Sequence, residues 1–333
     1  FFANCKEFGY GDDITKELWR QIESFGAYSF SKAHSASFAV ESYQSLFLKS
    51  YFPMEFMVAV INNFGGFYSR ELYFYELMKT GARVHAPCVN RSDYLTNIEG
   101  TDSHVGFIHI KSLEEAMAEK IIAERKRSGP YLHLQDFIER TEITMEQLNI
   151  LIRVGALRFT GKNKKELLWE ANFLQKKNKT HVPQHHSLFL EKPKEFTLPS
   201  LPTYPLDDWY DEVELLGFPV RDPFEGVDDD PSKYVPAGEL KNHVGEIVTV
   251  LGYHITQKPV RTVKGETMSF GTFIDSHKDW IDTVHFPQVY HMAPPQSGFF
   301  RITGKVIEEF KVNSIEVTYI EKAGIKKRMD SSS

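Results

Sequence analysis

Basic and acidic side chains gather in separate stretches of this 333-residue chain, and a cluster of like charges can bind a ligand of opposite charge. Residues 161–179 contain six lysines and two glutamates, whereas residues 206–230 contain ten acidic residues and one arginine. The chain has a net charge of −6, and since 206–230 carries −9, the remainder carries +3. This distribution is compatible with a surface that faces phosphate groups. Lysine-rich helix faces that are simply solvated would give the same pattern.

Carboxylates that hold catalytic metal ions are a second kind of chemistry. Nucleotidyl transfer needs carboxylates that place two divalent ions about 4 Å apart. The run Asp228–Asp230 is the candidate, but it precedes Pro231 in a proline-rich stretch, which favours a solvated acidic loop. We therefore predict no metal site and no catalytic residue in this chain. The hydrolase motifs GxSxG, HExxH and GxxxxGKS/T are absent from the sequence.

The two cysteines, Cys5 and Cys88, show no CxxC spacing. A chain of this length can fold without disulfides, so we expect free thiols in a reducing cytosol and exclude a zinc finger. Apolar residues make up 41% of the chain without a run long enough to cross a membrane, which favours a soluble protein. The chain begins Phe1-Phe2-Ala3, which we interpret as an excised piece of a longer protein.

Apolar periodicity predicts helices through the first half of the chain. Ile14, Leu18 and Ile22 recur at intervals of four after a pair of aspartates, and similar spacing continues towards Gly81. We expect residues 1–95 to form one helical bundle. Residues 96–173 predict short helices separated by glycine turns, a pattern typical of small helical modules.

The second half of the chain changes character twice. Residues 174–242 contain nine prolines and the acidic run, which predicts a partly ordered linker. Residues 243–325 predict five short strands with a turn-rich loop after the first, as in an OB-type Greek-key barrel, with a half-open sandwich as the alternative. Residues 326–333 are a tail. The predicted fold is therefore multidomain: mainly α in the first two thirds, with a C-terminal all-β OB-fold barrel.

Four segments, taken together, resemble one known family. Residues 25–39 read FGAYSFSKAHSASFA and are followed by SYQ at 42–44 and PMEFM at 53–57. This wording is similar to the fingers region of bacterial DNA polymerase III alpha subunits, the DnaE family. In the same order, three later segments resemble the family's helix-hairpin-helix region, its ELLGF element and its C-terminal OB domain: residues 110–157, 214–224 and 260–306. The wording at 66–69, GFYS, leans towards the error-prone translesion branch.

The resemblance implies where catalysis would lie. The family holds two Mg²⁺ ions in a palm domain upstream of the matched segments, so no cofactor is expected in this fragment, and it should not polymerise alone. A fingers domain supplies cations for the triphosphate of the incoming nucleotide. Lys32 and His34 are the candidates for this role. The alternative is that His34 caps a helix and Lys32 is solvated.

The helix-hairpin-helix resemblance implies contacts to phosphates through backbone N–H groups at a glycine hairpin. The family's hairpin reads approximately IKGVGE, whereas this chain reads IKSLEE at 110–115. A Cβ at Ser112 and the two glutamates oppose the approach of an anion. We therefore expect the DNA contacts of this region to come from lysines: Lys111, Lys120, Lys162, Lys164 and Lys165.

The linker contains a candidate clamp-binding motif. Gln184, Leu188 and Phe189 resemble the short peptide with which the family binds the sliding clamp, in which adjacent Leu and Phe fill an apolar pocket. The alternatives are a local hydrophobic latch, or a metal site formed by three histidines: His181, His185 and His186.

The predicted barrel carries residue types that bind single strands, namely basic groups with aromatic stacking platforms. We expect Lys258, Arg261 and Lys264 to lie on the first long loop, residues 257–265, with Phe270 or Phe273 as the stacking residue and the other phenylalanine in the core.

These expectations define a template-binding part of a DNA-directed DNA polymerase that acts in replication or translesion synthesis in the bacterial cytoplasm. The expected partners are primed-template and single-stranded DNA, the sliding clamp and other replisome subunits, with no membrane. The alternative is a non-catalytic single-strand-binding or scaffold protein built from the same modules. A reading frame extended upstream would discriminate the two by showing or lacking the palm carboxylates.

Overall fold

The computed structural model describes residues 1–28, 32–66, 68–178, 203–204, 206–292, 298–309 and 311–328. The chain divides into two compact units, Phe1–Phe56 and Met57–Ser333. Within the described residues, none of the helices combines the length and apolarity that crossing a membrane would take.

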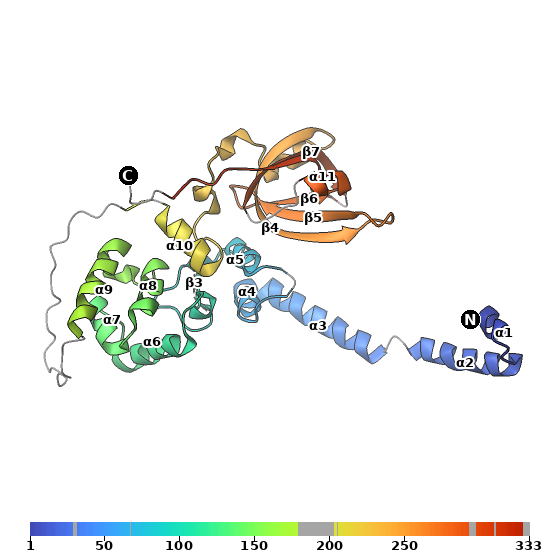
Figure 1. Ribbon diagram of the computed structural model, residues 1–333, viewed down its shortest axis with the longest axis horizontal. Coiled ribbons are helices and arrows are strands. Elements are labelled where there is room, and N and C mark those ends of the chain that lie inside the picture. Colours follow the sequence, from blue (N-terminus) through green and yellow to red (C-terminus); the bar gives the residue numbers. More distant parts are fainter. Residues whose placement is uncertain are drawn as a thin grey trace. The chain divides into compact units, whose positions relative to one another are not determined.

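The first unit is helical, as predicted, and contains α1 (Phe2–Glu7), α2 (Asp12–Tyr28) and α3 (Lys32–Tyr51) (Figure 1). The predicted spacing of Ile14 and Ile22 places both on α2, yet their side chains are 59% and 48% exposed. The expected single bundle over residues 1–95 is therefore wrong. The helices form, but the division falls at Phe56, so that α5 and most of α4 belong to the other unit.

The second unit begins with the buried residues of α4 (Pro53–Asn62) and with α5 (Arg70–Lys79). Phe74, Tyr75 and Leu77 of α5 are buried. A small sheet follows that sequence reasoning did not predict, with β1 (Arg83–His85), β2 (Asn97–Glu99) and β3 (Asp102–His104) in the order β1-β3-β2. Its strands are three residues long and rich in charged residues and histidine, so they show no apolar alternation.

Short helices then follow in the region predicted to be a helix-hairpin-helix module: η1 (Phe107–His109), α6 (Glu115–Ser128), α7 (Leu134–Thr141), α8 (Met145–Arg153), η2 (Arg158–Thr160) and α9 (Lys164–Asn178). The side chains of His133 and Thr144 cap α7 and α8 by accepting backbone N–H groups. Gly129 and Gly155 follow α6 and α8 with φ of 80° and 76°, a conformation that glycine adopts without a steric penalty.

The C-terminal part of the predicted linker is folded. It contains α10 (Asp207–Leu216) and the 3₁₀ turns η3 (Pro223–Gly226), η4 (Pro231–Lys233) and η5 (Ala237–Asn242). The interpretation of Asp228–Asp230 as a solvated loop needs correction at Asp229. Its carboxylate lies 2.7 Å from Nε of Arg301 and its side chain is 10% exposed. Asp230 accepts the N–H of Ser232 and caps η4.

The C-terminal region is a closed five-stranded barrel, as predicted (Figure 1). Its strands are β4 (Ile247–Arg261), β5 (Thr267–Ile274), β6 (Trp280–His285), β7 (Phe299–Glu309) and β8 (Val312–Lys322), with α11 (Pro287–Met292) between β6 and β7. The order around the barrel is β4-β5-β6-β8-β7, and the β6–β8 pair is parallel. Five strands closed in this order match the OB-fold.

The barrel shares a hydrophobic core with the helices of the second unit. Tyr75 of α5 and Trp209 of α10 pack in one buried cluster with Tyr253 and Phe299 of the barrel. The indole N–H of Trp280 donates to a carboxylate oxygen of Glu76 in α5 at 3.0 Å. The barrel is therefore fixed to the helices by packing and by a hydrogen bond.

Candidate nucleic-acid interface

The hairpin before α6 keeps its turn without the family's glycine. Ser112 has a φ of 63°, in the left-handed region that favours glycine. Gln147 of α8 holds this turn, because its Nε2 donates to the carbonyl of Ser112 at 3.0 Å and its Oε1 accepts the N–H of Glu114 at 2.8 Å. The N–H of Lys111 donates to the carbonyl of Leu215 in α10 at 2.8 Å. Two backbone donors near this turn are therefore used inside the protein.

The hairpin after α8 is built around Gly155. A Cβ atom at this position would lie 2.3 Å from Cζ of Arg158, which is closer than real Cβ contacts come. Nη1 of Arg158 donates to the carbonyl of Gly155 at 3.3 Å. Glycine therefore provides the positive φ and also the space in which the guanidinium lies against the backbone.

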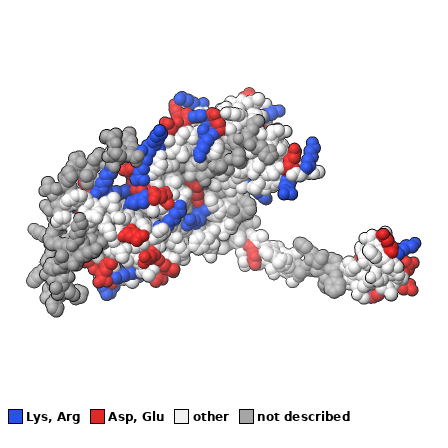
Figure 2. Space-filling view, in the orientation of Figure 1, with Lys and Arg blue, Asp and Glu red and all other residues white. Residues whose placement is uncertain are grey.

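Four of the five predicted helix-region lysines form ion pairs or cation–π contacts within the protein. Lys164 lies 2.6 Å from Asp208 and 2.9 Å from Asp211. The others contact an acidic or aromatic group: Lys120 with Glu142 at 2.8 Å, Lys162 with Glu170 at 2.7 Å, and Lys165 with Asp207 at 4.0 Å and over the ring of Tyr204 at 4.3 Å. The side chain of Lys111 is exposed. Figure 2 accordingly shows blue and red side chains intermixed on the face in view.

The acidic residues of α10 also pair with arginines. Asp211 and Glu212 have side chains only 3% exposed, and they pair with Arg153 at 2.9 Å and Arg158 at 3.5 Å. Burial opposes ionisation of Asp208, but its bond to Lys164 and the nearby arginines hold its pKa below the ordinary value. The acidic residues of α10 therefore form a network of ion pairs inside the second unit, which we call the charged joint.

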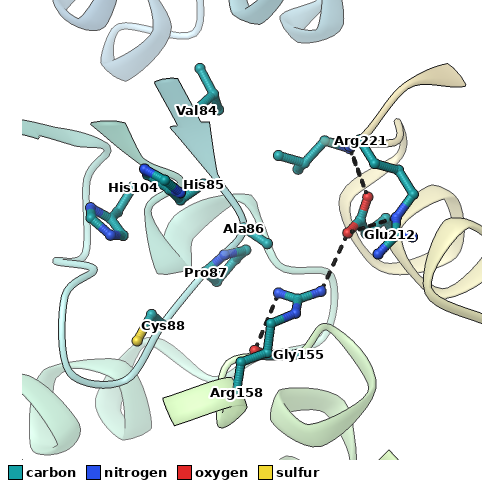
Figure 3. A pocket seen from close by; sticks show the side chains of 11 residues that line it. Val84, His85, Ala86, Pro87, Cys88, His104, Gly155, Arg158, Glu212 and Arg221 are labelled. Atoms are coloured by element: carbon teal, nitrogen blue, oxygen red, sulfur yellow. Dashed lines mark hydrogen bonds and ion pairs between the residues drawn. The ribbon is translucent and has the colours of Figure 1, made fainter. Parts of the chain in front are cut away.

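A pocket of about 400 Å³ opens beside this joint (Figure 3). Arg158 and Arg221 line one side with Glu212 between them, and His85 and His104 lie across from them. The two imidazole rings stack with centroids 4.9 Å apart, and His85 Nε2 lies 2.7 Å from a carboxylate oxygen of Asp102. Burial, with His85 and Arg91 nearby, lowers the pKa of His104 and favours its neutral form.

The barrel separates the two phenylalanines that the sequence could not assign. Phe270 is 47% exposed, whereas Phe273 is fully buried in the barrel core. Residues three apart on a strand point to opposite faces, so only one of them could face outward. Phe273 is therefore corrected from a stacking candidate to a core residue. The predicted loop over residues 257–265 is wrong in its first part, because β4 continues to Arg261 and pairs there with β5. Lys258 and Arg261 therefore lie on β4 and Lys264 on the turn before β5, and all three side chains are exposed.

Two further predictions fall at other places in the chain. Lys32 is the first residue of α3, but its side chain lies outside the described part. His34 is exposed in α3, with its ring 4.4 Å from that of Phe38. The clamp-binding candidates and the alternative histidine set lie outside the described residues: Gln184, Leu188, Phe189, His181, His185 and His186.

Sequence reasoning missed the residues that shape this region. Gln147, Arg158 and Arg221 belong to no motif, and their partners lie far along the chain or across a turn. One pattern could have indicated the arginines, since ten acidic residues within residues 206–230 call for cationic partners if that segment folds.

Comparison with known proteins gives a consistent set of relatives. A family model described as a helix-hairpin-helix motif matches residues 81–167. The DNA polymerase III subunit alpha of Aquifex aeolicus is 30% identical over 88% of this chain and 25% of that relative, and the one from Treponema pallidum is 26% identical over 87% and 26%. An error-prone DNA polymerase of Mycobacterium tuberculosis is 31% identical over 49% of this chain and 15% of that relative. The chain thus spans about a quarter of the length of the alpha subunits it matches.

Proposed function

We propose that this chain, a member of the DNA polymerase III alpha subunit family, holds the DNA on which a DNA-directed DNA polymerase acts. The observation that carries this proposal is the match to polymerase alpha subunits over 88% of the chain. The helix-hairpin-helix match over residues 81–167 supports it, because such modules bind the DNA backbone without reading its sequence.

The arrangement of the second unit supports the same role. α10 pairs with α8 through Asp211 and Arg153, and it packs against the barrel through Trp209. It therefore connects the helical module to which we assign duplex binding with the barrel to which we assign strand binding. A rigid connection of this kind would hold two DNA-binding surfaces at a constant spacing. On the barrel we assign strand contacts to Arg261, Lys264 and the exposed ring of Phe270.

Binding to DNA is tested with the purified chain by fluorescence anisotropy, using a primed template and a single strand over a range of salt concentrations. We expect the affinity to fall linearly in a plot of log K against log salt, with a slope of about −0.9 per duplex phosphate contacted and about −0.7 per single-strand phosphate. Binding that is absent at low salt, or that does not change with salt, would contradict the proposal.

The purified chain is expected not to polymerise, because no acidic pair in its sequence has the context of a two-metal site. Primer extension with Mg²⁺ and nucleotides is the test. Incorporation above that of a no-protein control would contradict this part of the proposal.

We also propose the roles that the resemblance implies for the first unit and the segment before α10. In the whole polymerase, Lys32→Ala should raise the nucleotide concentration needed for half-maximal extension, and we assign His34 to the same triphosphate site. The double substitution of Leu188 and Phe189 by Ala, with Gln184 kept, should abolish binding to the sliding clamp. An unchanged nucleotide requirement would remove the first role, and an unchanged clamp affinity the second.

A further inference from the structure

A two-stranded ribbon of β4 and β5 continues past the barrel. β4 pairs with β7 only as far as Tyr253, and β5 pairs with β6 only from Ser269 onward. Residues 260–268, which we call the projecting ribbon, therefore pair only with each other in the described part of the chain. Figure 1 shows β4 and β5 extending away from the barrel. None of residues 260–268 is buried, so the projecting ribbon takes no part in the barrel core.

Backbone hydrogen bonds hold the turn that closes the ribbon. The N–H of Thr262 donates to the carbonyl of Glu266 at 2.8 Å, and the N–H of Gly265 donates to the carbonyl of Thr262 at 2.9 Å. Oγ1 of Thr262 accepts the N–H of Glu266 at 3.2 Å. Gly265 has a φ of 81°, which glycine adopts without a steric penalty. The turn therefore forms without any contribution from the side chain of Val263.

Val263 stands at the tip of this turn. It is fully exposed, at 109%, whereas the next most exposed large apolar residue that the structure describes, Phe8, is at 76%. Tight turns favour glycine, proline and short polar residues, and valine favours strands. A single exposed apolar residue is nevertheless common on protein surfaces. The groups beside the tip decide what it could bind.

Two cations without partners lie beside the tip. The side chains of Arg261 and Lys264 are exposed, and neither forms an ion pair or a hydrogen bond within the described residues. Glu266 is the one carboxylate of residues 260–268, so the projecting ribbon keeps a net positive charge. Lys164 of the helical region differs, because it pairs with acidic residues of α10. Unpaired exposed cations attract phosphate groups.

An apolar tip between cations fits one particular surface of DNA. Along a duplex the outside carries phosphates, and the grooves present the polar edges of the bases. The flat apolar face of a base pair is accessible only where the duplex ends, and there phosphates flank it. Apolar side chains can also separate stacked bases by wedging between them. The end of a duplex therefore offers both partners that the tip and its cations would need.

We propose that Val263 packs against the last base pair of a duplex at the point where a single strand leaves it, with Arg261 and Lys264 on the phosphates beside it. This inference rests on the proposed function, in which the same two cations contact the single strand. It adds a contact to the end of the duplex, so the projecting ribbon recognises the junction rather than either form of DNA alone.

The test measures binding of the full 333-residue chain to a labelled DNA hairpin with a single-stranded tail, and to oligo(dT). Val263→Ser should weaken binding to the tailed hairpin about fivefold, since part of a valine side chain is no longer buried, and should leave the salt slope unchanged, since no charge is lost. Its binding to oligo(dT) should equal that of wild type. Val263→Leu keeps an apolar tip and should bind the tailed hairpin as wild type does. The matched control is Val244→Ser, which removes a 45% exposed valine that precedes β4, at the other end of that strand.

A base analogue reports the contact itself. With 2-aminopurine in the last base pair of the hairpin, wild-type protein should raise the fluorescence, because the analogue brightens when it loses stacking, and Val263→Ser should not. Wild-type affinity and fluorescence in Val263→Ser would overturn the inference and leave the proposed function standing. An equal loss of affinity for oligo(dT) would give the tip to an unpaired base and refute the junction contact. A wild-type dimer that Val263→Ser dissociates, with DNA binding unchanged, would give the tip to a second copy of the chain and also refute it. Failure of the wild-type chain to bind any DNA would overturn the proposed function as well.

Discussion

The carboxyl group of Glu71 allows a quantitative prediction about the interface between α5 and the barrel. The hydroxyl of Tyr75 donates to it at 3.1 Å, and Tyr253 of β4 also forms a hydrogen bond with it. Burial raises the pKa of Glu71 to about 7 from its usual value of 4.5. The folded protein therefore binds this proton more tightly than the unfolded chain does.

The sign of the pH dependence follows from this difference. Below pH 4.5 Glu71 is protonated in both states and imposes no penalty. As the pH rises from 4.5 towards 7, the unfolded chain ionises first and stability falls. Above pH 7 the loss is complete at about 3 kcal/mol, from a pKa difference of about 2.5 multiplied by about 1.36 kcal/mol.

Glu71→Gln should remove this penalty while keeping an oxygen that accepts from Tyr75. The variant is expected to be more stable than wild type at pH 8, by up to about 3 kcal/mol, and close to wild type at pH 4.5. Urea unfolding followed by tryptophan fluorescence measures the free energy of unfolding, because Trp209 and Trp280 lie at the same interface. The control is Glu119→Gln, an exposed glutamate of α6. A stability difference that is equal at both pH values would refute the reasoning.

Three further predictions concern single side chains. Gln147→Ala leaves the turn before α6 without its two side-chain hydrogen bonds and should cost about 2 kcal/mol in the free energy of unfolding, measured by urea denaturation; a neutral effect would contradict its role as an anchor. Gly155→Ala should cost more than Gly161→Ala. Both glycines have a positive φ, but only a Cβ at Gly155 meets a side chain; equal costs, expected at about 1–2 kcal/mol, would show that Arg158 moves freely. Phe273→Ala should cost about 3–5 kcal/mol, whereas Phe270→Ala should leave the melting temperature nearly unchanged and weaken single-strand binding; the reverse order would invert the assignment of the two faces.

The sequence predicted best the elements with a regular spacing of apolar residues or with a cap at the end of a helix. Alternation at residues such as Val248 and Val250 predicted the barrel, and both are buried in its core. Capping by Thr144 and termination at Gly155 predicted α8, because caps and positive-φ positions are local features. Ser112 in place of glycine argued against phosphate binding at the hairpin before α6, and the structure keeps a left-handed backbone at this serine.

The rest depended on contacts between distant residues. The partners of Lys164 lie 44 and 47 positions along the chain, so no local pattern could reveal that this lysine is paired. The acidic composition of α10 predicts exposure, and the arginines and lysines that approach it from distant parts of the chain reverse that prediction. The three-residue strand β1, which lines the pocket beside the charged joint, has no period to detect.

The charged joint at α10 has a consequence for how this molecule responds to electrolytes. Added salt competes with contacts to phosphate, including those of the DNA interface that we propose, and the same ions also act on the pairs that hold α10 in place. Asp211 and Glu212 are almost completely enclosed, with side chains 3% exposed, and screening by mobile ions acts weakly on enclosed charges. The second unit should thus keep its fold at ionic strengths that dissociate nucleic acid, so that the proposed DNA partner would be released from a folded protein.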